Sequence, residues 1–173
     1  MPVEIDWGRV DRELDGRGFA SVGSLLNLED SRELRSAFDD EGRFRKHVVM
    51  EAHSYGRGDY KYFDYPLPQT VQSLRTGFYP RLAPIAQRWA EALGRDISYP
   101  DTLDDYLEEC HQAAQTRATP LILRYTEGGY NRLHQDLYGD LYFPIQLVIL
   151  LSDPTRDFTG GDIVLTEQRA RVQ

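Results

Sequence analysis

The stretch YTEGGYNRLHQD (residues 125–136) says most about the fold, because it joins a turn to two side chains suited to binding a metal. The double glycine at 128–129 predicts a turn, and residues 130–136 alternate as a strand does. Side chains two residues apart on a strand project from the same face. We therefore expect the imidazole of His134 and the carboxylate of Asp136 to lie side by side.

An imidazole beside a carboxylate provides two of the three protein ligands in the two-histidine, one-carboxylate site of non-haem Fe(II) oxygenases. The other face of such an ion stays open for a co-substrate and oxygen. A His-x-Asp triplet is short and occurs often by chance. Its other interpretation is a hydrogen-bonded pair on a surface strand, so the flanking segments must decide.

Strand-like segments flank the triplet on both sides. The runs 120–125 and 142–151 are apolar, and the second is rich in Ile, Leu and Val, which predicts a buried strand. A second double glycine at 160–161 predicts a turn into another strand at 162–166.

The first two thirds of the chain show helical patterns instead. Asp6 is a plausible N-cap for a helix over 5–16, and Thr102 caps another. Apolar residues recur at steps of three and four between Gln69 and Leu93, where Gly77, Pro80 and Pro84 predict a kink or two helices. A further helix is predicted over 30–38 and a short strand over 19–22.

Helices followed by strands predict an α+β fold, with helices packed on one side of a β sandwich or barrel. We divide the single domain into a helical part, residues 1–117, and a β core, residues 118–173. About four strands are too few for a sandwich of about eight. We therefore expect the β core to be incomplete in this chain.

These segments resemble the 2-oxoglutarate/Fe(II)-dependent dioxygenase superfamily over about residues 120–166. Arg124-Tyr125, Leu133-His134-Gln135-Asp136 and Pro144-Ile145 are similar to the AlkB-type nucleic-acid dealkylases. Leu151-Ser152-Asp153 followed by Gly160-Gly161-Asp162 also resembles prolyl hydroxylases. The resemblance implies a double-stranded β-helix, or jelly-roll, core buttressed by N-terminal helices.

The resemblance also implies a site and its cofactors. His134 and Asp136 match the proximal iron ligands, and Fe(II), 2-oxoglutarate and O2 are the expected cofactor and co-substrates. Tyr125 matches a tyrosine whose hydroxyl contacts 2-oxoglutarate, although it could equally be a core aromatic. Leu123 stands where AlkB-type enzymes have an asparagine, which removes one expected co-substrate contact.

The distal histidine and the arginine that pairs with 2-oxoglutarate are expected some tens of residues after Gly161. Arg169 and Arg171 come too early for that arginine. The other three histidines, His47, His53 and His111, all precede the triplet, and none is a convincing third ligand. We therefore expect this chain to hold only part of the site.

The resemblance implies oxidation of a substrate C–H bond, and three functions stay open. The first is oxidative dealkylation of damaged nucleic acid, which bears on DNA repair. The second is hydroxylation of a prolyl or small-molecule substrate. The third is a non-catalytic binding module, if the natural chain ends at residue 173, because the form shown here is expected to be inactive.

Basic and aromatic residues alternate over residues 43–65, a segment with net charge +2. Such residues suit a stacked base and its phosphate. The segment could form a substrate lid, with Arg57, Tyr60 and Tyr62 as candidate substrate-binding residues. The other interpretation is a solvated hairpin whose aromatics pack onto the barrel.

Composition limits the remaining possibilities. The net charge of −8 argues against nonspecific nucleic-acid binding by the whole surface, but it permits a local basic patch. Cys110 is the single cysteine, so no intramolecular disulfide forms. The first ten residues lack an apolar signal core, and no apolar run could span a bilayer. These features predict a cytoplasmic protein without a membrane partner, and they leave its oligomeric state open.

Overall fold

The computed structural model describes residues 4–136 and 141–167. Its helices are α1 (Trp7–Arg17), α2 (Leu28–Ala37), α3 (Gln69–Ala92) and α4 (Leu103–Gln112). Its strands are β1 (Phe44–Val49), β2 (Gly56–Arg57), β3 (Asp59–Phe63), β4 (Leu121–Arg124) and β5 (Tyr130–Asn131). The mixed α and β class is confirmed, but the order differs from expectation because three strands lie between α2 and α3.

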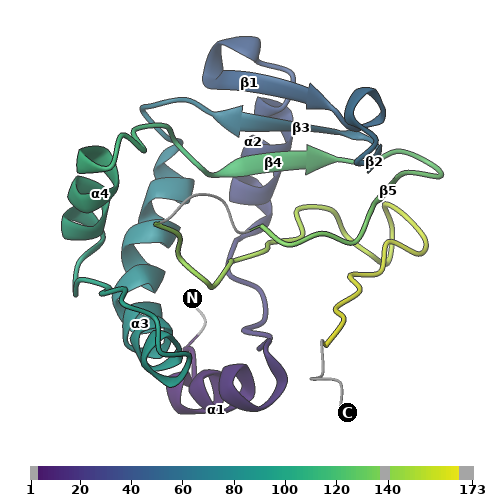
Figure 1. Cartoon of the computed structure of the whole chain (residues 1–173). Helices are drawn as coiled ribbons and strands as arrows, with labels where there is room; N and C mark the ends of the chain where they lie inside the picture. The colour runs from purple at the N-terminus through teal and green to yellow at the C-terminus, as the bar shows by residue number, and fades with distance from the viewer. Residues whose placement is uncertain (1–3, 137–140, 168–173) are drawn as a thin grey trace.

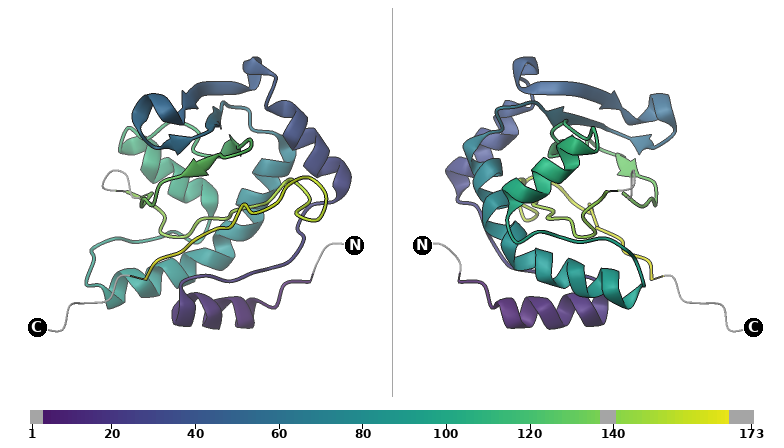
Figure 2. Two further views of the ribbon diagram at one scale, coloured as in Figure 1. Left: turned by 90° about the vertical axis from the view of Figure 1, so that its right-hand side faces the viewer. Right: turned by 60° about the vertical axis from the view of Figure 1, so that its left-hand side comes forward.

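The helix ends follow the local signals in the sequence. The Asp6 carboxylate accepts a hydrogen bond from the Arg9 backbone N–H at 2.9 Å, and Thr102 caps α4 through the Asp105 N–H. The long helix α3 continues through Pro80 and Pro84 as one element. Its ribbon changes direction along its length (Figure 2), as expected where proline removes a helical N–H donor.

The main sheet is antiparallel with the strand order β1-β3-β4, and α2 packs against one of its faces (Figure 1). On β3, Lys61 and Phe63 are buried, whereas Tyr60 and Tyr62 on the opposite face are half-buried. A core cluster joins α2 to this sheet through Leu34, Phe38, Phe63, Leu67, Ala118 and Ile122. The second sheet pairs β2 with β5.

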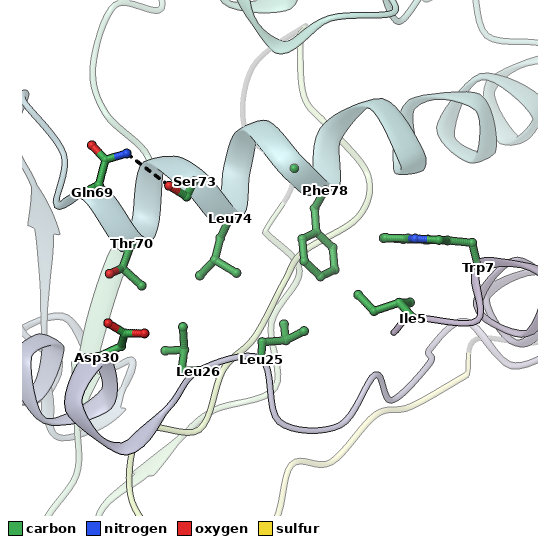
Figure 3. Close-up of a pocket in the computed structure, with 11 residues that line it drawn as sticks. Ile5, Trp7, Leu25, Leu26, Asp30, Gln69, Thr70, Ser73, Leu74 and Phe78 are labelled. Atoms are coloured by element: carbon green, nitrogen blue, oxygen red, sulfur yellow. Dashed lines mark hydrogen bonds between the residues drawn. The ribbon is translucent and has the colours of Figure 1, made fainter. Parts of the chain in front are cut away.

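The helices form two further core clusters. One joins α3 to α4 around Tyr79 and Tyr106, and the other joins α1 to α3 around Val10 and Leu82. Phe143 and Ile145 pack against both clusters, so the C-terminal segment crosses the helical layer. A surface pocket opens beside α3, lined in part by Trp7, Leu26, Leu74 and Phe78 (Figure 3).

Three predicted strands are wrong in the described residues. The segments 19–22, 142–151 and 162–166 have no strand pairing, and Val148, Ile163 and Val164 are more than 60% exposed. An apolar, β-branched run indicates only strand propensity, whereas a strand also needs a hydrogen-bonded neighbour. The predicted jelly roll is not seen here. No helix among the described residues is long and apolar enough to cross a membrane.

Candidate active site

The short β2–β5 pair ties the start of the His134 segment to the β1–β3 hairpin. Gly56 pairs with Asn131, and the Arg132 N–H donates to the Tyr55 carbonyl at 2.8 Å. Gly56 has φ +142°, and a Cβ there would lie 2.2 Å from the Tyr130 carbonyl oxygen. Only glycine permits this close approach. The strand ends at Asn131, so the expected strand through Asp136 is wrong.

His134 and Asp136 nevertheless lie side by side, as predicted. The distance from His134 Nε2 to Asp136 Oδ1 is 3.4 Å, and both side chains are more than one third exposed. Gln146 Nε2 donates to the other carboxylate oxygen, Asp136 Oδ2, at 2.8 Å. One oxygen of Asp136 is therefore held by Gln146 while the other faces the imidazole.

The hydrogen bond at the opposite side of the imidazole determines its tautomer. His134 Nδ1 lies 2.6 Å from the Arg132 carbonyl oxygen. A carbonyl oxygen only accepts hydrogen bonds, so Nδ1 carries the proton and donates. In the neutral ring, Nε2 then presents its lone pair toward a carboxylate oxygen. Two acceptors at this distance repel each other unless a cation or a second proton lies between them.

The pair fits an iron ion by distance and by donor type. Two ligands bound at right angles to one octahedral ion, each at about 2.1 Å, lie about 3 Å apart. The observed 3.4 Å is close to that separation. A donating Nδ1 is also the usual outer contact of a histidine that binds a metal through Nε2. Among residues 4–136 and 141–167, no group of three possible ligands is found.

Tyr125 lies at the end of β4, 44% exposed, against Gly58. Burial raises the pKa of its hydroxyl, and a side-chain hydrogen bond with Asn131 opposes that rise. The hydroxyl is therefore protonated at neutral pH and able to donate. Leu123 pairs with Tyr60 across the sheet and is 43% exposed. The hydrogen bond with Asn131 connects Tyr125 to the start of the His134 segment. A contact between Tyr125 and 2-oxoglutarate stays a prediction.

The other predicted site residues lie on the hairpin. Residues 44–49 and 59–63 pair as β1 and β3, so most of the segment 43–65 forms part of the sheet. The rings of Tyr60 and Tyr62 are in edge contact, with centroids 5.5 Å apart. Arg57 is exposed and lies near Gly128 of the turn after β4. Whether the hairpin acts as a lid over the site stays a prediction.

Gln146 is a site residue that the sequence reasoning missed. Its signal was a single polar residue inside the apolar run 144–151. Gln146 is exposed, and its side-chain amide donates to Asp136. The remaining histidines do not join the pair: His47 contacts Asp59, His53 stacks on Tyr55, and His111 is exposed on α4.

Comparison with known proteins assigns this chain to a family. Residues 58–173 match a family described as "Oxygenase, catalysing oxidative methylation of damaged DNA". The chain belongs to this oxygenase family. The assignment confirms the resemblance to AlkB-type dioxygenases. The matched range contains β3, β4, β5 and the whole of the His134–Asp136 segment.

The chain is also similar to two proteins of Mycobacterium tuberculosis. Two uncharacterized proteins of Mycobacterium tuberculosis, from strains CDC 1551 and H37Rv, are each 52% identical over 111 residues. That alignment covers 64% of this chain and 48% of each relative, so the match spans about half of their length. No solved structure matches this chain.

Proposed function

We propose that this chain carries two of the protein ligands of an Fe(II)- and 2-oxoglutarate-dependent oxygenase that acts on alkylated DNA. The observation that carries the proposal is the orientation of His134. Its Nδ1–H is held by the Arg132 carbonyl, and its Nε2 faces Asp136 Oδ1 at 3.4 Å. The family assignment supports oxygenase chemistry and a damaged-DNA substrate.

Each residue of the site has a distinct part in the proposal. His134 and Asp136 hold the metal, and Gln146 keeps the carboxylate turned so that a single oxygen binds. In this proposal the Tyr125 hydroxyl donates a hydrogen bond to 2-oxoglutarate. Fe(II), when bound, supplies the activation of O2 that oxidises a substrate C–H bond. A jelly-roll core remains the fold that this proposal expects.

Succinate release tests the function. The natural protein is incubated with Fe(II), 2-oxoglutarate and either a methylated oligonucleotide or a proline-containing peptide. We expect succinate with the oligonucleotide, and none above background after the substitution Asp136→Ala. The substitution His111→Ala is the matched control, because this histidine lies on α4 outside the site. Succinate release with the peptide but not with the oligonucleotide would show that the substrate is prolyl rather than DNA.

A further inference from the structure

Arg45 occupies an irregular position in the sheet. Phe44 pairs with Phe63 and Lys46 pairs with Tyr62, so Arg45 is an extra residue between two paired positions of β1. Such a bulge re-aims one side chain out of the regular alternation, and bulges are common beside active sites. Simple alternation along the strand therefore does not determine the direction of Arg45.

The Arg45 guanidinium is fixed by two contacts. Its Nε donates to the Ala118 carbonyl at 2.8 Å, and its Cζ lies 4.4 Å from the centroid of the Tyr62 ring. These two contacts fix the position of the guanidinium while using only one of its N–H donors, the one on Nε. Among residues 4–136 and 141–167, no hydrogen bond or ion pair reaches its two terminal nitrogens. Arg45 as a whole is half-buried.

The residues around Arg45 connect it to the proposed metal site. Burial raises the pKa of Tyr62, the positive charge of Arg45 lowers it, and the negative charge of Asp136 raises it. The β2–β5 pair joins the hairpin that carries Arg45 and Tyr62 to the segment that carries Asp136. Tyr60 contacts the Tyr62 ring, and Tyr55 also acts on the Tyr62 pKa.

This combination suits one class of ligand. A planar fork of free N–H donors matches the two oxygens of a phosphodiester. Half-exposed tyrosines provide ring surfaces on which bases stack. β1 supplies Arg45, β3 supplies Tyr60 and Tyr62, and the β2–β5 pair joins this hairpin to the segment of Asp136, although the whole chain carries a net charge of −8. The local chemistry is therefore that of a short binding site for single-stranded nucleic acid.

We infer that Arg45, held on the Tyr62 ring, binds a backbone phosphate of single-stranded DNA and positions the strand beside His134 and Asp136. This inference rests on the proposed function and extends it to a particular positioning residue. Tyr55 and Tyr60 provide neighbouring surfaces for the bases. Arg45 takes no part in binding iron.

The test is the affinity of the natural protein for a fluorescent 12-nucleotide oligothymidylate, measured by anisotropy without Fe(II) over a range of salt concentrations. Arg45→Gln is expected to weaken binding about tenfold and to reduce the salt slope by about 0.7, the value for one phosphate contact on a single strand. Arg45→Lys keeps the charge and is expected to restore the slope but only part of the affinity, since the fork is lost.

Arg9→Gln is the matched control, because it removes the same charge from α1, where the guanidinium already pairs with Glu13. We expect it to bind DNA as the wild type does. Equal affinity for Arg45→Gln and the wild type would overturn the inference, as would an equal loss in the Arg9 variant. If Arg45→Gln fails to fold, judged by thermal unfolding, Arg45→Lys and Tyr62→Leu decide in its place, and wild-type DNA affinity in both overturns the inference.

The same variants separate this inference from the proposed function. A loss of DNA binding in Arg45→Gln, in a protein that does not bind Fe(II), would support the DNA surface and refute the iron site. If Arg45→Gln binds DNA normally but needs more 2-oxoglutarate for turnover, Arg45 binds the co-substrate carboxylate. That result would overturn the inference and leave the proposed oxygenase function intact. If Arg45→Gln loses binding to a proline-containing peptide while its DNA affinity is unchanged, the inference is overturned as well.

Discussion

At the scale of single residues, the partners of Asp136 matter as much as its own carboxylate. Gln146 holds one oxygen of Asp136 at 2.8 Å and thereby directs the other toward His134. Outer contacts of this kind typically account for about 10- to 100-fold in metal affinity. The importance of Gln146 follows from its contact with Asp136, ten residues earlier, which spacing within residues 125–136 does not reveal.

We expect Gln146→Leu to weaken Fe(II) binding by about tenfold or more, because the Asp136 carboxylate then rotates freely. Leucine preserves most of the volume, and the neighbouring apolar run tolerates it. Competition against a coloured chelator under anaerobic conditions measures the affinity. Gln112→Leu, an exposed change on α4, is the control. An unchanged affinity in Gln146→Leu would show that the hydrogen bond does not orient the ligand.

Lys61 is the buried charge of the sheet. It is 3% exposed, and its ammonium donates to the Phe38 carbonyl and to the Glu41 carboxylate. Lys61→Met fills the same space but leaves the carbonyl without its donor. We expect a loss of about 2 kcal/mol in the free energy of unfolding, measured by urea denaturation. A variant as stable as the wild type would show that the ammonium contributes nothing net.

The contact between Lys61 and Glu41 contributes to stability in a pH-dependent way. The hydrogen bond from Lys61 holds the pKa of this carboxyl below its usual value of 4.5. A group whose pKa is lower in the folded state stabilises above its unfolded pKa, and that contribution is lost as the pH falls through the folded pKa. The stability difference between the wild type and Glu41→Gln should therefore be constant at neutral pH and shrink below pH 4.5. A difference that grows in acid would contradict this.

At the scale of elements, the helices were the most predictable part of the molecule. Asp6 and Thr102 cap α1 and α4 as expected, because a cap depends on atoms within a few residues. The prediction of a strand over residues 142–151 was wrong because strand pairing, unlike a cap, depends on residues distant in sequence. Its apolar residues serve the helical core through Phe143 and Ile145, and no described strand pairs with it. Pairing partners are distant in sequence, so an apolar run alone does not predict them.

The cap of α4 yields a stability prediction. Thr102→Ala removes the oxygen that accepts from the Asp105 N–H, and should cost about 1 kcal/mol of unfolding free energy. Thr102→Ser retains that oxygen and should cost clearly less. Thermal unfolding of both variants makes the comparison. Equal losses would mean that the threonine methyl group, rather than the cap, stabilises this end of the helix.

The β2–β5 pair couples the hairpin to the proposed metal ligands. Gly56→Ala would place a Cβ against the Tyr130 carbonyl at a positive φ, so we expect it to separate the pair and weaken Fe(II) binding. Gly77→Ala is the control, because it lies within α3 with open space around it and should raise stability by up to about 1 kcal/mol. Normal iron affinity in Gly56→Ala would show that the pair does not position the site.

At the scale of the whole molecule, long-range pairings bring the site together. β3 lies between β1 and β4, and β2 reaches β5 across more than 70 positions of sequence. The sequence allowed us to predict that His134 and Asp136 are neighbours because they are only two residues apart. The bulge at Arg45 depends on the pairing of β1 with β3, and the contact from Gln146 depends on the path of an unpaired segment, so neither was predictable locally.

The central claim is that His134 and Asp136 bind Fe(II), and anaerobic titration of Fe(II) into the natural protein tests it most directly. His134→Ala should lower the affinity by more than about a hundredfold. Thermal unfolding should be nearly unchanged, because the side chain is 46% exposed. His111→Ala should bind iron normally. Wild-type iron affinity in the folded His134→Ala variant would contradict the account.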